Sequence, residues 1–350
     1  MKRREFGKGL LGAAGLSALP NAVTKPSSAQ SQNPFSSPIN VIIPAKYALP
    51  EVNESSNYAF RLTRATLDFL EASYAGQTVP IWYRKFEEID FEKRVSNITY
   101  WIMQGAQRYQ TIHPVDPAWI MAQIMHESYF YEFAVSGSLA VGICQFVSRT
   151  AHEFEMLCAG DKAEHKSAGY KMAELADEES RYFSLIRQKR NFTRTNQMRD
   201  DFNFENLVEA IAAGGAQSWQ ADAEKYLANK ARLEAFDEDI RQARDGYMQF
   251  IRANLEGRDI FNEADLDFLL QFDERVTYKK PIFGMIQMLA RSLRARNGYI
   301  IAAAAGYNAG LSTTLAEGLF RPYGKIPNFE ETVTYLSRVF VLHHEISKRI

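Results

Sequence analysis

The spacing of apolar residues constrains the fold most, because from Tyr58 onward it follows the period of a helix almost throughout. Residues 58–75 and 91–109 carry apolar side chains three and four positions apart, which predicts two amphipathic helices. Runs of alternating β-branched residues between turn residues are missing, so an extensive sheet is not expected. The chain is therefore predicted to be mainly α-helical, and its hydrophobic content of 46% suits a protein with a substantial core.

The first residues have the pattern of an export signal. Lys2, Arg3 and Arg4 precede a short, weakly apolar stretch over residues 9–19 that is rich in small residues. The paired arginines, followed by phenylalanine and lysine, are typical of twin-arginine signals. The apolar stretch is too short to span a bilayer comfortably, so removal is expected rather than a permanent anchor. Residues 1–29 are interpreted as this signal, and the protein is expected in the periplasm.

The next residues predict a linker and a first helical segment. Residues 30–56 are rich in Ser, Pro, Asn and Gln and are interpreted as a tether. Residues 57–90 are interpreted as an N-terminal helical segment. The formal net charge of the whole chain is -1, so its overall charge points neither to nucleic acid nor to an anionic membrane as partner.

A clear helix start follows at Asp116 and Pro117. An aspartate caps exposed amide groups, and proline suits the first helical position because its missing N–H would have no partner there. Ile120, Met121, Ile124 and Met125 then form one apolar stripe that is expected to face the core. Glu127 stands at the end of this helix.

Residues 152–272 are interpreted as an inserted helical subdomain resembling a coiled coil. Aromatic and aliphatic residues recur there at every seventh position, namely Trp219, Tyr226, Leu233, Ile240 and Tyr247, with Phe236, Ala243 and Phe250 three residues after three of them. Residues 170–190 are a second amphipathic candidate that would pair with this stripe. The only two cysteines, Cys144 and Cys158, are expected to be separate buried thiols.

Four short segments carry a recognisable pattern in a fixed order. They are His126-Glu127-Ser128, then Ser136 to Gln145 (SGSLAVGICQ) continued by Thr150-Ala151, then Ala302 to Gly310 (AAAAGYNAG), and finally Pro327 followed by Glu331 to Tyr335 (ETVTY). Together they resemble the signature of the lytic transglycosylases whose fold is shared with goose-type lysozyme. The resemblance covers residues 91–151 and 273–350, which are expected to form the lysozyme-like domain. Leu139, Cys144 and Gly306 depart from the family pattern, where Gly, Met and Ala stand.

The resemblance implies cleavage of the MurNAc–GlcNAc β-1,4 bond of peptidoglycan, with Glu127 as the one general acid/base. Breaking a glycosidic bond requires an acid that holds its proton near neutral pH, and apolar surroundings raise the pKa of a glutamate. The matching segments offer no second carboxylate. In the resembled family the substrate's N-acetyl oxygen stabilises the cationic centre, and the muramyl 6-hydroxyl attacks to leave a 1,6-anhydromuramyl end.

The resemblance also implies supporting roles, and no metal or cofactor. The expected substrate-binding residues are Ser128, Ser136, Gln145, Tyr307, Asn308 and Tyr335, the last of which would help to position Glu127. Gly142 would let the backbone turn tightly beside the site. The partners implied are peptidoglycan glycan strands, with the insertion expected to affect substrate choice or the binding of a protein partner, or else to be a stabilising elaboration.

The sequence also bears on other functions. The pair His126-Glu127 is not part of a zinc-protease motif, because Phe130 stands where the second histidine ligand would be. Two alternatives stay open: a hydrolytic muramidase that admits water in place of the 6-hydroxyl, and a non-catalytic peptidoglycan-binding or assembly scaffold. Retention of Glu127 argues against a purely binding role.

Overall fold

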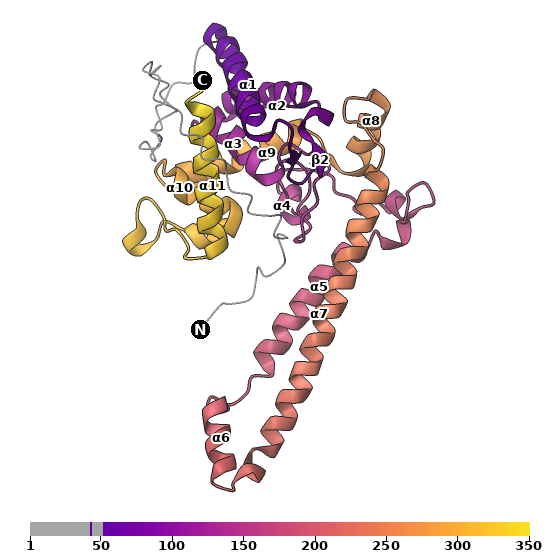
Figure 1. Cartoon of the computed structure of the whole chain (residues 1–350), viewed down its shortest axis with the longest axis vertical. Coiled ribbons are helices and arrows are strands. Elements are labelled where there is room, and N and C mark those ends of the chain that lie inside the picture. The colour runs from indigo at the N-terminus through magenta and orange to yellow at the C-terminus, as the bar shows by residue number, and fades with distance from the viewer. Residues whose placement is uncertain (1–42, 44–51) are drawn as a thin grey trace. The chain divides into compact units, whose positions relative to one another are not determined.

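The computed structural model describes residue 43 and residues 52–350, which group into two compact units (Figure 1). The first unit contains the chain up to Cys158 and from Arg258 onward, and the second contains Ala159–Gly257. Helices make up most of the described residues, which confirms the mainly α-helical prediction. The predicted export signal and most of the predicted tether lie outside the described residues.

Within its described residues the first unit has eight α-helices and one small sheet. The helices are α1 (Val52–Tyr74), α2 (Phe91–Tyr109), α3 (Pro117–Ser128), α4 (Ser148–His152), α8 (Glu263–Phe272), α9 (Lys279–Ala295), α10 (Ile300–Ala309) and α11 (Glu330–Ser347). Strands β1 (Thr78–Val79) and β2 (Arg84–Lys85) pair antiparallel, with Thr78 opposite Lys85. In the part of the chain that the structure describes, no helix is both long enough and apolar enough to cross a bilayer.

Helix α3 is the buried centre of the first unit. It packs against α11 and α2, and all nine residues from Pro117 to Met125 are buried. Its predicted start is correct: the Asp116 side chain accepts a hydrogen bond from the Ala118 N–H at 2.9 Å, and proline occupies the first helical position. A helix buried on all sides must be mainly apolar all round. The one polar side chain in the buried part of α3 is Gln123, which accepts a hydrogen bond from the Trp119 indole N–H at 3.0 Å.

Two boundaries differ from those predicted near the amino-terminal end. Helix α1 begins at Val52, inside the range interpreted as a tether. The segment 57–90 is also not helical throughout, because α1 ends at Tyr74 and the β1–β2 hairpin follows. Gly76, with a φ of +73°, and Pro80 interrupt helical periodicity there.

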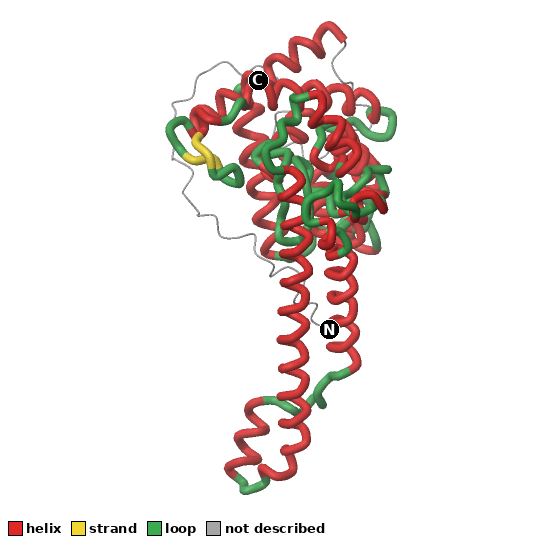
Figure 2. Tube along the Cα trace, turned by 90° about the vertical axis from the view of Figure 1, so that its right-hand side faces the viewer, coloured by secondary structure: helices red, strands yellow, loops and turns green. Residues whose placement is uncertain are grey.

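The second unit is a helical hairpin. Helices α5 (Glu178–Thr195) and α7 (Gln220–Leu255) run side by side, joined through α6 (Phe204–Ala212), as Figure 2 also shows. Four predicted stripe residues of α7 are buried, namely Phe236, Ala243, Tyr247 and Phe250. The partner helix begins later than predicted, since residues 170–177 form turns and a short 3-10 helix.

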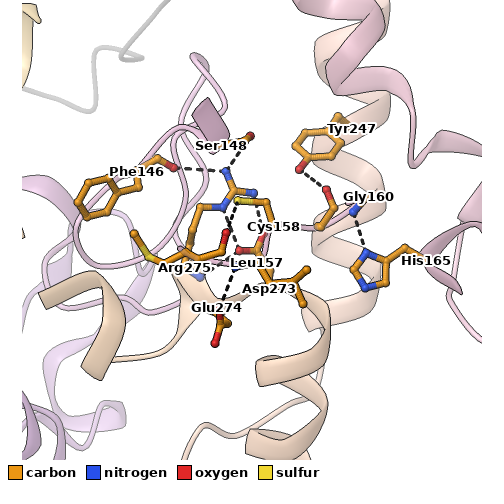
Figure 3. Close-up of polar contacts among 12 residues, drawn as sticks. Phe146, Ser148, Leu157, Cys158, Gly160, His165, Tyr247, Asp273, Glu274 and Arg275 are labelled. Atoms are coloured by element: carbon orange, nitrogen blue, oxygen red, sulfur yellow. Dashed lines mark hydrogen bonds and ion pairs between the residues drawn. The ribbon is translucent and has the colours of Figure 1, made fainter. Parts of the chain in front are cut away.

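The side chains of Tyr247, on α7, and His165 hold the first residues of the second unit. The Tyr247 hydroxyl donates to the Ala159 carbonyl at 2.7 Å, and the Gly160 N–H donates to Nδ1 of His165 at 2.9 Å (Figure 3). The second unit is shorter at both ends than the predicted insertion, and α8 groups with the first unit. Cys144 and Cys158 are both buried and are not joined by a disulfide, as expected.

A buried arginine, paired with an aspartate two residues away, joins two distant chain segments of the first unit (Figure 3). The Arg275 side chain is fully buried, and its Nη2 and Nε donate to the Asp273 carboxylate at 2.6 and 2.9 Å. Its Nη1 donates to the Phe146 carbonyl and the Ser148 hydroxyl, both at 3.3 Å. Gly142 packs so closely on this segment that a Cβ there would lie 1.8 Å from the Arg275 carbonyl oxygen. The arginine thus holds the loop before α4 against the segment before α9.

We expect Gly142→Ala to lower the free energy of unfolding by at least about 3 kcal/mol, because the added methyl group meets a backbone oxygen that cannot move without disturbing the buried pair. Gly76→Ala is the matched control. Gly76 also has a left-handed φ, but no atom lies within 4 Å of an added Cβ, so the change should cost only about 1 kcal/mol. Urea denaturation measures both, and equal losses would show that Gly142 is needed for its dihedral angle alone.

Candidate active site

Glu127 lies in the last turn of α3, where a polar residue follows the buried part of the helix. The chain leaves α3 through two consecutive residues with left-handed backbone, Tyr129 (φ 49°) and Phe130 (φ 63°). Leu139 (φ 63°) and Gln145 (φ 49°), in the loop that follows, share this conformation. Such backbone costs free energy for residues other than glycine and gathers at functional sites in proteins.

The carboxyl group of Glu127 contacts the hydroxyl group of Tyr335 on α11. The tyrosine donates a hydrogen bond to Glu127 Oε1 at 2.9 Å. Burial raises the pKa of Glu127 to about 8, although the hydrogen bond from Tyr335, which favours the carboxylate, lowers it. At neutral pH Glu127 is therefore protonated in most molecules, and its carboxyl group can donate that proton as an acid.

Tyr307 of α10 and Cys144 of the loop before α4 complete the surroundings of Glu127. The Tyr307 hydroxyl donates to the Cys144 carbonyl oxygen at 2.6 Å. Burial raises the pKa of Tyr307 and Tyr335 well above the usual range, and the nearby Glu127 carboxyl adds to both shifts. The pKa of the Cys144 thiol is raised for the same two reasons. The first sequence segment thus supplies the carboxyl group, and the second, third and fourth segments each supply a group near it.

The loop that contains Ser136 and Gln145 is held by its own hydrogen bonds. Isolated bridges pair Val141 with Val135 and with Phe146. The Ser136 hydroxyl accepts from the Ala140 N–H at 3.0 Å. The Gln145 amide donates to the carbonyl oxygens of Gly142 (2.9 Å) and Ala134 (3.3 Å). These contacts shape the loop beside Glu127, and the substrate-binding roles of Ser136 and Gln145 stay predictions.

Ser128 and Asn308 make contacts within the protein. The Ser128 side chain is fully buried, and its hydroxyl contacts the carbonyl oxygens of Ile143 (3.1 Å) and Ile124 (3.3 Å). Its position supports a structural role, joining α3 to the loop, rather than the predicted contact with a sugar. Asn308 Oδ1 accepts from the Thr332 hydroxyl at 2.9 Å, so Asn308 links α10 to α11.

His126 is a neighbour whose role the sequence analysis did not identify. Its ring lies edge-on to that of Tyr335, with 4.9 Å between the ring centres. Burial, and then the positive charge of Arg338, lower the pKa of His126 to about 4. The imidazole is therefore neutral at the pH where Glu127 holds its proton, and it packs against the tyrosine that contacts Glu127.

Residues before α3 support the end of the helix that carries Glu127, and no sequence motif pointed to them. The Trp82 indole N–H donates to the Tyr129 carbonyl at 2.8 Å, and the Tyr74 hydroxyl donates to the Tyr129 hydroxyl at 3.2 Å. Arg94 of α2 makes a two-point ion pair with the buried Glu132 carboxylate at 2.8 and 3.1 Å. Aromatic residues bounded by turn residues were the only available signal for the hairpin.

The arrangement is suited to proton transfer. A metal site would need several thiolate, imidazole or carboxylate ligands directed at one point. Around Glu127 the structure instead places two phenols and a thiol whose raised pKa keeps it protonated. Glu132, the next carboxylate along the chain, is held by Arg94 and is not available as a second catalytic acid.

Comparison with known proteins supports the same assignment. Residues 104–167 match the family model of the transglycosylase SLT domain. The matched range contains Glu127 and the loop up to Gln145, and it extends past residue 151, where the sequence analysis ended the first part of the domain. No curated protein and no solved structure gave a significant match. The structure places Tyr307 and Tyr335, which lie outside the matched range, against that part of the chain. The protein thus carries a transglycosylase SLT domain, the lysozyme-like domain of the lytic transglycosylase family.

Proposed function

We propose that the protein is a peptidoglycan lytic transglycosylase that cleaves the MurNAc–GlcNAc β-1,4 bond and leaves a 1,6-anhydromuramyl end. The SLT domain supports activity on peptidoglycan in general. One observation carries the finer proposal: Glu127 is a part-buried carboxyl with a pKa of about 8, and its one hydrogen-bond partner among the described residues is a tyrosine. A single acid of this kind suits a reaction in which the substrate supplies its own nucleophile.

The proposed reaction uses Glu127 twice. Its carboxyl group first donates a proton to the glycosidic oxygen, so that the GlcNAc end leaves as an alcohol while the N-acetyl oxygen of MurNAc stabilises the positive centre. The resulting carboxylate then takes the proton of the muramyl 6-hydroxyl, whose oxygen bonds to the anomeric carbon. This closes the 1,6-anhydro ring and restores the acid. The hydrogen bond from Tyr335 would orient the carboxyl group for both transfers.

The export signal predicted in residues 1–29 leads us to propose the periplasm as the place of this activity. Peptidoglycan lies outside the cytoplasm, and the paired Arg3 and Arg4 would direct the folded protein there. Fractionation of cells that produce the full chain tests the location, and retention of an Arg3→Lys, Arg4→Lys variant in the cytoplasm is the expected result.

We expect Glu127→Gln to abolish release of soluble muropeptides from purified sacculi, by at least about a thousandfold, because the amide keeps the shape of the acid but cannot donate the required proton. Mass spectrometry of the wild-type products decides among the functions. Products with anhydro ends support the proposal, reducing ends indicate a hydrolytic muramidase, and no release from either protein indicates a scaffold. Circular dichroism of the variant checks that the fold is intact.

The pH dependence of cleavage gives a second test. Glu127 must be protonated to act as the acid, so kcat/KM should fall as pH rises through about 8. Tyr335→Phe removes a hydrogen bond that lowers the pKa of Glu127, so the fall should move to higher pH while the maximal rate decreases. Tyr307→Phe is the matched control, because its hydroxyl donates to the Cys144 carbonyl and not to Glu127. If the alkaline limb of the pH profile of kcat/KM were unchanged in Tyr335→Phe, the assignment of Glu127 as the titrating acid would be wrong.

The raised pKa also predicts a stability effect. A carboxyl group whose pKa rises on folding makes its full contribution to the free energy of unfolding below its unfolded pKa of 4.5. That contribution is lost as pH rises toward the folded pKa of about 8. Glutamine cannot ionise, so the free energy of unfolding of Glu127→Gln should match that of the wild type near pH 4.5. At pH 8.5 it should exceed the wild-type value by about 2–4 kcal/mol, after allowance for partial solvent access. Urea denaturation at both pH values measures this difference, and an equal difference at both would mean that Glu127 does not titrate as inferred.

A further inference from the structure

The loop between α10 and α11, residues 310–329, has a firmly held base. Arg296 is buried, and its guanidinium donates to the Thr314 carbonyl (2.9 Å) and hydroxyl (2.6 Å) and to the Leu311 carbonyl (2.9 Å). A further N–H donates to the Ser292 hydroxyl at 2.8 Å. All of these acceptors are uncharged oxygens. Removing a guanidinium from water without a carboxylate partner is unfavourable. In this structure the hydrogen bonds of the Arg296 guanidinium fix the start of the α10–α11 loop.

Two glycines bring the same loop into close contact with Thr314. A Cβ at Gly306 would lie 2.7 Å from the Thr314 hydroxyl oxygen, and one at Gly324 would lie 2.5 Å from the Thr314 carbonyl oxygen. Gly324 also has a left-handed φ of +79°, and its N–H donates to the Phe320 carbonyl at 2.7 Å. Helix α10 and the later part of the α10–α11 loop therefore both pack against the buried Thr314 at the base of the loop.

Beyond this base the loop exposes apolar side chains. Leu319 is fully exposed and Phe320 is 52% exposed, in the short helical turn Gly318–Phe320. In Figure 1 the loop extends outward from α10 and α11. The exposed apolar residues of the loop are Leu311, Leu315, Leu319, Phe320, Tyr323, Ile326 and Phe329. Seven exposed apolar residues in one loop of twenty residues are more than scattered surface positions require, and such exposure is typical of a segment that another apolar body covers.

The charges of the loop are mainly positive and stand next to the apolar tip. Arg321 and Lys325 are exposed, and Glu317 is the one acidic residue in the loop, so its net charge is 2 − 1 = +1. Neither cation forms an ion pair within the part of the chain that the structure describes. Tyr323 lies between them in sequence. An apolar tip followed by tyrosine and basic side chains is the order found where proteins meet the headgroup region of a bilayer.

We propose that the α10–α11 loop inserts Leu319 and Phe320 into the surface of an anionic lipid bilayer, with Arg321 and Lys325 at the headgroup phosphates. The tip is glycine, leucine and phenylalanine, and none of their side chains can hydrogen-bond the hydroxyl groups of a sugar. A stable protein interface needs about 800 Å² from each partner, more than a two-residue tip supplies. A bilayer accepts a small apolar tip when cations lie beside it. The proposal does not depend on the proposed function.

Sedimentation of the full chain with lipid vesicles tests the proposal. The wild type should bind vesicles of phosphatidylethanolamine and phosphatidylglycerol more tightly than vesicles of phosphatidylcholine, and added salt should weaken that binding. We expect Leu319→Asp with Phe320→Asp to weaken binding at least tenfold. Arg321→Gln with Lys325→Gln should weaken it by about fivefold per cation and reduce its salt dependence.

Phe204→Asp is the matched control, because Phe204 is an even more exposed phenylalanine, on α6 of the other unit. It should bind vesicles as the wild type does, and every variant carries the same amino-terminal residues. Unchanged binding by the Leu319 and Phe320 variant, or an equal loss in the control, would overturn the proposal. So would a variant that binds vesicles normally but cleaves sacculi poorly, since the loop would then contact substrate. Cleavage of small soluble muropeptides should be the same in the variant and the wild type, which separates this test from that of the proposed function.

Discussion

The site depends on the buried Arg275 side chain, because the first unit is made from two stretches of chain separated by the helical hairpin and this side chain joins them. Taking both charges out of water is unfavourable by several kcal/mol each, and the contacts recover this only when the geometry is good. Here both oxygens of Asp273 accept from the guanidinium, and Phe146 and Ser148 accept as well. Asp273 holds the arginine, and the bonds of the arginine to Phe146 and Ser148 then fix the position of the loop that carries Gly142, Cys144 and Gln145.

Around Glu127 the fold accepts local costs that neighbouring burial offsets. Tyr129, Phe130, Leu139 and Gln145 hold left-handed backbone at about 1 kcal/mol or more each. Phe130 and Leu139 are fully buried, and burial of such side chains contributes about 1.5–3 kcal/mol each. The loop can therefore keep a conformation that presents one carboxyl group to two tyrosines. The cost that remains is that of the acid itself, whose ionised form the surroundings disfavour.

Short-range features were predictable from the sequence, and long-range ones were not. Asp116 and Pro117 determine a helix start through contacts within three residues, and the seven-residue stripe of α7 required a partner helix. The contact of Trp82 with Tyr129 spans 47 residues, and that of Arg296 with Thr314 depends on how α9 meets the α10–α11 loop. Neither has a local pattern. The pairing of Tyr335 with Glu127, 208 residues apart, was expected only because a family resemblance implied it.

The departures from the family pattern are explained by contacts specific to this chain. Leu139 stands where a glycine is usual, yet it keeps the left-handed backbone that glycine would favour, and its buried side chain offsets the strain. Gly306 replaces alanine because the Thr314 hydroxyl oxygen occupies the space a methyl group would need. Cys144 replaces methionine, but it is its backbone carbonyl that accepts from Tyr307, and any residue supplies that group. In each case the backbone geometry around Glu127 is kept while the side chain changes. The chemistry of the site therefore constrains the path of the backbone more tightly than it constrains the identity of the side chains.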